Sequence, residues 1–250
     1  MQSLVVCGEN FVNANCLISV SSGDSYKGRI CDNKRATRFT TSGSSEGVAA
    51  TVQVDFYDRV GSAVSRTFNR LMLLNHNLKN FYIEYWDGVA WQTIAESVFT
   101  TNEDADLYIV MAASVSTTSI RLTATNTIGA VAEKLIGELL ACLFMTSVRH
   151  VVTLDRADWD DGGDYRLDDG TLVDFMRNTK FEAKVSLQQM SLTTYEIVEP
   201  LIRERASMVW ILHYDFRAAD VYHLKATSQP ETSLDPKMEL YKMNFQVKER

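Results

Sequence analysis

The sequence predicts a mainly β protein built from two domains. Its 250 residues are enough for one or two domains of ordinary size. A content of 46% hydrophobic and 23% charged residues is typical of a globular chain. Short apolar stretches separated by turn signals recur along the first 147 residues, and this spacing is typical of a β-sandwich or barrel.

About seven strands are predicted in the first domain, residues 1–147. An opening strand is expected at 4–20, followed by a long loop over Ser21–Gly47. Asp87-Gly88 between two aromatic runs predicts a tight β-hairpin, because both residues tolerate positive φ. The other strands are expected at 48–56, 71–74, 81–86, 91–94, 107–111 and 119–125.

The stretch Gly129–Met145 fits two structures. Val131, Leu135, Leu139 and Cys142 recur at helical spacing, and a run of more than about ten residues favours a helix. The segment from Leu135 to Leu139 equally fits a strand with a bulge at its glycine.

The second domain, residues 148–250, is expected to be β-rich with one helix. Strands are predicted at 148–154, 181–187, 208–214 and 240–247, and an acidic loop at 155–169. Thr193 and Glu196 fit a capping box that would open a helix at about 193–206. Pro200 within this stretch predicts a kink or a late start at Glu199.

Several stretches of the first 145 residues resemble the discoidin, or coagulation factor 5/8 type C, family of galactose-binding-like sandwiches. The segment from Asp32 through Thr37 to Phe39 is similar to the family's Asp-x4-Thr-x-Trp element, with Phe39 in place of the usual Trp. Arg121-Leu122 and the segment 136–139 resemble the two closing strands, which favours a strand over a helix at 135–143. The strand that follows the family's Asp-x4-Thr-x-Trp element has a counterpart in Val52–Phe56. The family's hairpin, an apolar strand followed by Asp-Gly and then Trp, has counterparts in Phe81–Gly88 and Trp91–Ile94.

The form of the sandwich most resembles the module of phage tail and baseplate proteins, such as distal tail proteins. The resemblance implies a structural component of a tail tip or baseplate, located in the virion tail after synthesis in the host cytoplasm. It also implies a homo-oligomeric ring, a hexamer by resemblance, that contacts tail tube, hub or fibre proteins. The first alternative is a carbohydrate-binding module for attachment to a cell surface, and the second is a glycan-active enzyme.

Charge and hydropathy exclude two classes of partner. The net charge is −7, and acids outnumber bases in both domains, by 14 to 11 in the first and by 18 to 14 in the second. Direct nucleic-acid binding is therefore not expected, since it needs basic excess. No apolar run reaches the roughly 18 residues of a membrane span, and the N-terminus lacks the pattern of a secretory signal.

Catalytic and metal-binding patterns are missing from the sequence. The four histidines are scattered, and no nucleophile elbow or phosphate-binding loop occurs. We therefore expect no enzyme and no cofactor. The cysteines match no zinc spacing and are expected to be buried free thiols; they are Cys7, Cys16, Cys31 and Cys142.

The acidic loop 155–169 only partly fits a Ca²⁺ loop. Asp158, Asp160, Asp164 and Asp169 stand at oxygen-ligand positions, but Gly162 replaces one ligand and Asp169 replaces the bidentate glutamate. A solvated surface that faces a basic partner is the favoured interpretation.

Two features are candidates for ligand binding or an interface. Trp86 could be exposed as a sugar-stacking platform, whereas Trp91 is expected to pack between the sheets. The resemblance implies ligand-binding loops at one end of the sandwich, and the 21–47 loop there has five bases that could bind an acidic glycan or an acidic surface of a neighbouring copy. These bases are Lys27, Arg29, Lys34, Arg35 and Arg38.

Overall fold

The chain divides into two compact units in a computed structural model, which describes residues 4–32, 37–148, 151–166, 172–211, 221–236 and 238–249. For Asp24, 151–166 and 172–181 it describes the backbone alone. One unit is Gly8–Phe144, and the other joins Met1–Cys7 to Met145–Arg250. The expected division at residue 147 differs from this at residues 1–7 and 145–147, because the segment Leu4–Cys7 pairs with a strand of the second unit.

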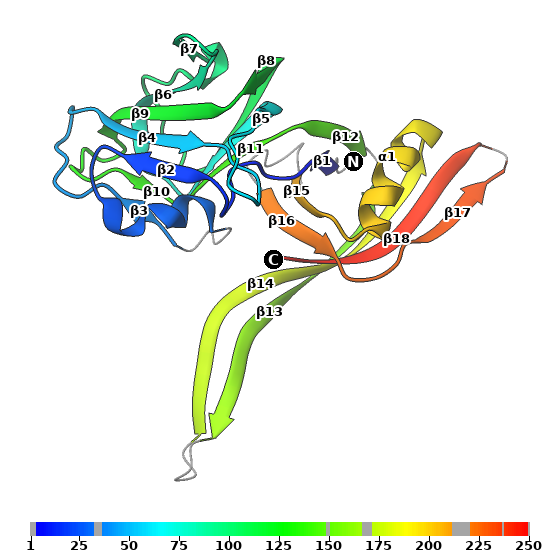
Figure 1. Cartoon of the computed structure of the whole chain (residues 1–250). Coiled ribbons are helices and arrows are strands. Elements are labelled where there is room, and N and C mark those ends of the chain that lie inside the picture. The colour runs from blue at the N-terminus through cyan, green and yellow to red at the C-terminus, as the bar shows by residue number, and fades with distance from the viewer. Residues whose placement is uncertain are drawn as a thin grey trace. The chain divides into compact units, whose positions relative to one another are not determined.

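The unit Gly8–Phe144 is a β-sandwich, so the predicted fold class is confirmed (Figure 1). One sheet has five strands in the order β2 (Leu17–Val20), β4 (Ala50–Asp55), β9 (Ser119–Thr127), β6 (Leu78–Trp86) and β7 (Trp91–Thr93). The other has the order β11 (Glu138–Cys142), β5 (Arg66–Leu74) and β8 (Leu107–Thr117). Smaller elements are the pair β3 (Phe39–Thr40) and β10 (Leu135–Ile136), and the short helices η1 (Asp24–Cys31) and η2 (Ala95–Ser97).

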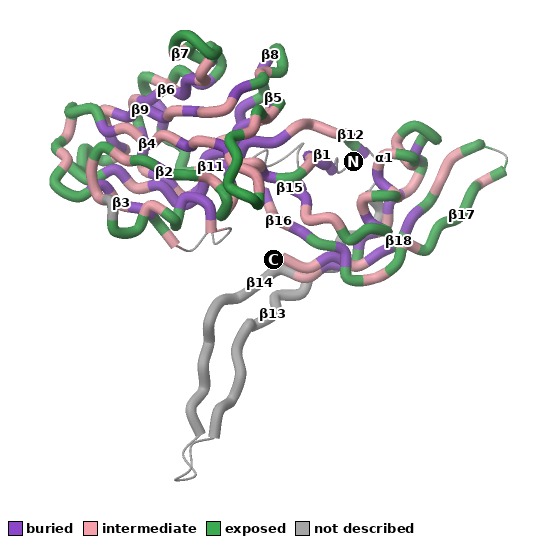
Figure 2. Tube along the Cα trace, viewed as in Figure 1, coloured by how far each residue is buried: buried purple, intermediate pink, exposed green. Residues whose placement is uncertain are grey.

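Both sheets contribute alternate residues to a single core (Figure 2). Val52 and Val54 of β4 are buried while their neighbours along the strand are half-buried, as alternation along a strand requires. Phe39 is fully buried in this core, and Thr37 closes the preceding loop by donating a hydrogen bond to Asp32 over 2.8 Å. The matched Asp-Thr-Phe element is therefore a structural feature of the sandwich.

The ambiguous stretch near residue 135 forms strands, so the strand prediction is confirmed and the helix alternative is wrong. Gly137 separates β10 from β11, where a Cβ atom would lie only 2.7 Å from the carbonyl oxygen of Leu74. The close approach of two backbones explains why a glycine interrupts this strand. The opening strand predicted at 4–20 is instead two strands in different sheets, β1 (Leu4–Cys7) and β2.

The second unit is a curved sheet with one helix packed on it. The main path of the sheet is β12 (Phe144–Val148), β1, β15 (Ser207–Ile211), β16 (Val221–Ala226), β18 (Leu240–Glu249), β14 (Leu172–Met190) and β13 (Val151–Arg166), and β17 (Glu231–Asp235) pairs with β18. The helix α1 (Leu192–Arg203) buries Val198 and Ile202 in a core with Trp210 and Phe245. None of the helices in the described part of the chain is long and apolar enough to span a membrane.

Three predictions for the second unit are wrong. Most of the acidic stretch 155–169 is strand, because residues 151–166 pair with β14 in a long hairpin with a register shift between Asp160 and Gly162. The helix predicted at about 193–206 is confirmed at Leu192–Arg203, but Ser191 caps it by accepting a hydrogen bond from the Thr194 N–H over 3.2 Å. The expected capping box therefore does not form, and Pro200 lies inside the helix rather than at a late start.

Candidate functional site

The hairpin β6–β7 holds two tryptophans on the solvent side of the five-stranded sheet. Asp87 fixes the turn, since its Oδ1 accepts hydrogen bonds from the N–H groups of Val89 and Ala90 at 2.8 and 2.7 Å. These bonds from Ala90 and Val89 lower the pKa of the Asp87 carboxyl. Gly88 takes a φ of 103°, so the predicted Asp-Gly hairpin is confirmed.

Trp86 and Trp91 lie directly opposite each other in the register of this hairpin. Their ring centroids are 5.5 Å apart with an interplanar angle of 61°, an edge-to-face arrangement. The Thr117 hydroxyl donates a hydrogen bond to the Trp86 carbonyl over 2.7 Å, which further fixes the strand end. Both side chains are half-buried.

An arginine covers one side of the pair. The Arg121 guanidinium carbon lies 4.3 Å from the centroid of the Trp91 ring, within the range of a cation–π contact. Arg121 also donates from Nε to Glu84 Oε2 over 2.9 Å and places Nη2 at 2.8 Å from the same oxygen. Glu84 and Arg121 are register partners on β6 and β9.

We call Glu84, Trp86, Trp91 and Arg121 the tryptophan face. Along β6 the core positions are Phe81, Ile83 and the partly buried Tyr85, so Glu84 and Trp86 point to the opposite side of the sheet. The expectation that Trp91 packs between the sheets is wrong, because it lies on the edge strand β7 and contacts Trp86 and Arg121 instead of the core cluster.

The bases of the 21–47 loop are only partly brought together. Arg29 lies 4.2 Å over the ring of the exposed Tyr26 and donates a hydrogen bond from Nη1 to the carbonyl of Arg38 over 3.2 Å. Lys27 is half-buried on η1, whereas Lys34 and Arg35 lie outside the described residues.

The calcium candidates are not assembled into a site that the structure describes. The backbones of Asp158, Asp160 and Asp164 belong to β13, and Asp169 lies outside the described residues. In the described part of the chain, no three His, Cys, Asp or Glu side chains group as metal ligands would.

The environment of the cysteine thiols does not favour a role as nucleophiles. Cys7, Cys31 and Cys142 are buried, as predicted, Cys16 is half-buried, and none of the four forms a disulfide. Burial raises the pKa of the Cys31 thiol to about 11 and also raises that of Cys16. These two thiols therefore stay protonated at neutral pH and are weak nucleophiles.

Comparisons with known proteins find solved structures that are similar to about half of this chain. The sequence matches no family model and no curated protein. CpGH89CBM32-6 produced by Clostridium perfringens is 18% identical over 53% of this chain and 98% of its own, with a TM-score of 0.42. Chitosan-binding module 1 of a chitosanase/glucanase from Paenibacillus sp. IK-5 is 20% identical over 53% of this chain and 98% of its own, with a TM-score of 0.42.

A putative alpha-L-fucosidase from Bacteroides thetaiotaomicron is 18% identical over 54% of this chain but only 29% of its own, with a TM-score of 0.45. At these values the likeness supports no conclusion about ligands.

Proposed function

We propose that the sandwich unit is a non-enzymatic module that binds a neutral saccharide on the tryptophan face. The observation that supports this most directly is the pair of half-buried tryptophans on the solvent side of a sheet whose core lies on the other side. Aromatic rings at such a place offer an apolar surface for the C–H face of a sugar ring, with polar groups beside it for orientation.

The polar groups of the face suit hydroxyl groups better than ions. Arg121 and Glu84 neutralise each other in their ion pair, so the face presents no unbalanced charge to an ionic ligand. Arg121 has five N–H donors, and the described contacts with Glu84 use its Nε and Nη2 groups. Further N–H groups can donate to a hydroxyl beside the Trp91 ring.

The same ion pair favours binding over catalysis. A general acid in glycoside hydrolysis needs a carboxyl group that keeps its proton, together with a second carboxylate across the bond. Glu84 is the one carboxylate of the tryptophan face, and its Oε2 accepts charged hydrogen bonds from Arg121. The face as described therefore lacks the second carboxylate that a hydrolytic pair needs.

Binding to immobilised neutral glycans, followed by calorimetric titration, tests this proposal. We expect Trp86→Ala to weaken binding by about tenfold or more, the scale of a lost aromatic contact. The matched control is Tyr26→Ala, which removes an aromatic side chain that is 59% exposed in the 21–47 loop. Loss of binding in the control but not in Trp86→Ala would move the site to the loop end and refute the proposal.

We also propose that the second unit assembles with other copies, as a ring at a phage tail tip would require. The favouring observation is the hairpin β13–β14, which pairs from Val151↔Leu187 out to Arg166↔Leu172, while the described pairing of β14 with β18 stops at Glu182 (Figure 1). A two-stranded hairpin on its own is marginally stable in water, so a contact with another chain would stabilise it.

The mass of the chain in solution and images of any particle that contains it test this second proposal. A closed oligomer, with a hexamer as the expectation, would support the ring. A monomer at all concentrations that also occurs in no assembled particle would refute it and leave the saccharide-binding role alone.

A further inference from the structure

The second unit contains a polar groove where one side of β18 changes its partner. β16 pairs with β18 at residues 247–249, and β17 pairs with it at residues 240–244. Between these two pairings, residues 227–230 form an arch that belongs to neither strand. The arch keeps two contacts with β18, since the Thr227 N–H donates to the Gln246 carbonyl and the Ser228 hydroxyl accepts from the Gln246 N–H, both over 2.9 Å.

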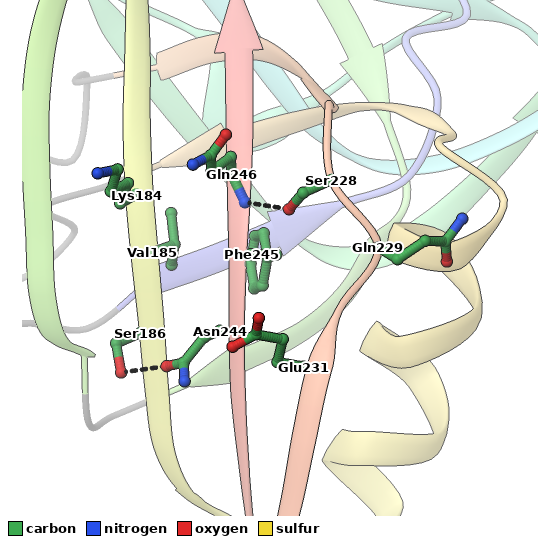
Figure 3. A pocket seen from close by; sticks show the side chains of 9 residues that line it. All are labelled: Lys184, Val185, Ser186, Ser228, Gln229, Glu231, Asn244, Phe245 and Gln246. Carbon is green, nitrogen blue, oxygen red and sulfur yellow. Dashed lines mark hydrogen bonds between the residues drawn. The ribbon is translucent and has the colours of Figure 1, made fainter.

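The resulting cavity has a volume of about 410 Å³ (Figure 3). This lies within the range of about 300–1,000 Å³ that is typical of small-molecule sites. The side chains of Val185 and Phe245 belong to the core cluster of the unit, whereas the residues next to them along the strands face the groove. Those neighbours are Lys184, Ser186, Asn244 and Gln246.

The lining contains one cation, one anion and three carboxamides. Lys184 lies on β14 and Glu231 on β17, on opposite sides of β18, and the amides come from Gln229, Asn244 and Gln246. Asn244 is held in place by the Ser186 hydroxyl, which donates to its Oδ1 over 2.7 Å. The Nδ2 group of Asn244 is a donor on the same amide.

The chemistry of this lining limits the class of ligand that it can bind. The charges balance, so a ligand with a net charge gains little from the groove as a whole. The lining combines apolar surface with charged and amide groups, so it suits a ligand that has both C–H surface and hydroxyl groups. A hydroxyl-rich neutral ligand can donate to the carboxylate and the amide oxygens and accept from the ammonium and the amide N–H groups.

We propose that this groove is a second saccharide site, independent of the tryptophan face and without an aromatic platform. In this site Lys184 and Asn244 donate hydrogen bonds to the sugar hydroxyl groups, and Glu231 accepts them. The two sites lie in different units of the chain, so each can be tested without the other.

The test is an amide-shift NMR titration of the whole chain in the Trp86→Ala background, with galactose, N-acetylglucosamine and maltose as the neutral probes and glycylglycine as a zwitterionic probe. We expect at least one sugar to shift the amide signals of Asn244 and Gln246. The double variant Asn244→Ala/Glu231→Gln should weaken this response by about tenfold, the loss expected for removing hydrogen bonds to a bound ligand. The control Thr232→Ala, at an exposed position next to Glu231, should leave it unchanged.

Three outcomes overturn the proposal. They are the absence of a shift with every sugar, a response to glycylglycine alone, and a sugar response that survives the double variant. Because the background already lacks Trp86, failure of the proposed function on the sandwich leaves the groove signals as they are. Failure of the groove likewise leaves the sandwich titrations of the wild-type chain intact.

Discussion

Lys134 is the most deeply buried charge among the described residues of the sandwich, and its replacement by methionine is expected to destabilise that unit. The side chain is 1% exposed. Its ammonium group donates to the carbonyls of Ser45, Val48 and Ala132 at 2.7, 3.0 and 3.5 Å. Methionine keeps the apolar stem and removes the three donors.

The expected loss follows from the two short bonds. A hydrogen bond to a charged group contributes about 1.5–3 kcal/mol. The ammonium regains hydration in the unfolded chain, and the Ser45 and Val48 carbonyls belong to exposed residues that water can reach. We therefore expect Lys134→Met to lower the free energy of unfolding by about 2–4 kcal/mol. For a unit of this size that corresponds to a fall in melting temperature of roughly 6–12 °C.

Scanning calorimetry of the whole chain measures this change, with Lys79→Met as the control at an exposed lysine of the same unit. The control should change stability by less than about 0.5 kcal/mol. Because an ammonium group rather than a metal ion gathers these carbonyls, excess EDTA should leave the wild-type melting temperature unchanged. A melting temperature of Lys134→Met equal to that of the control would refute the reasoning, and an EDTA-sensitive wild type would refute its metal-free premise.

Three further outcomes are expected. Burial lowers the pKa of His76 to about 4, whereas a histidine in an unfolded chain titrates near 6.5. The unfolded chain therefore binds the proton first as the pH falls. The contribution of His76 to the free energy of unfolding is fully present above about pH 6.5 and falls by up to about 3 kcal/mol toward pH 4. His76→Asn, which keeps an acceptor for the Leu78 N–H, should flatten that decline in urea titrations, and an equally steep decline in the variant would contradict the assignment. Gly137→Ala should lower the melting temperature because its Cβ would lie 2.7 Å from a carbonyl oxygen, whereas Gly28→Ala, with no heavy atom within 4 Å, should not; equal effects would contradict the close approach. Residues 8–144 expressed alone should give a cooperative melting transition, and an unfolded fragment would show that the sandwich needs the second unit.

Local patterns predicted much of the sandwich. The alternation over 48–56, the apolar run at 71–74 and the Asp-Gly turn each correspond to an observed element, because strand period and turn chemistry are local properties. The stretch at 135–143 could not be settled by its spacing alone. Its helical and strand patterns overlap, and the pairing of β11 with β5 decides between them through residues far away in the sequence.

Long-range pairing explains what the sequence missed. Leu4–Cys7 joins β15, about two hundred residues away, so no local signal separates it from the strand that follows. The tryptophan face depends on β9 lying between β4 and β6, which places Arg121 opposite Glu84. The alternation of Glu84 and Trp86 against the buried Ile83 was a usable signal, but only the strand order adds Arg121 and moves Trp91 out of the core.

The most direct test of the saccharide-binding proposal is an NMR titration that follows the indole N–H signals of the whole chain. The sequence has four tryptophans, so four indole signals are expected, and Trp86→Phe and Trp91→Phe assign the two of interest. For a neutral glycan that the protein binds, we expect the Trp86 and Trp91 signals to shift together with one dissociation constant. The signal of the fully buried Trp210 should not move. A glycan that binds with the same constant while both signals stay in place would contradict the assignment of the tryptophan face as the binding site.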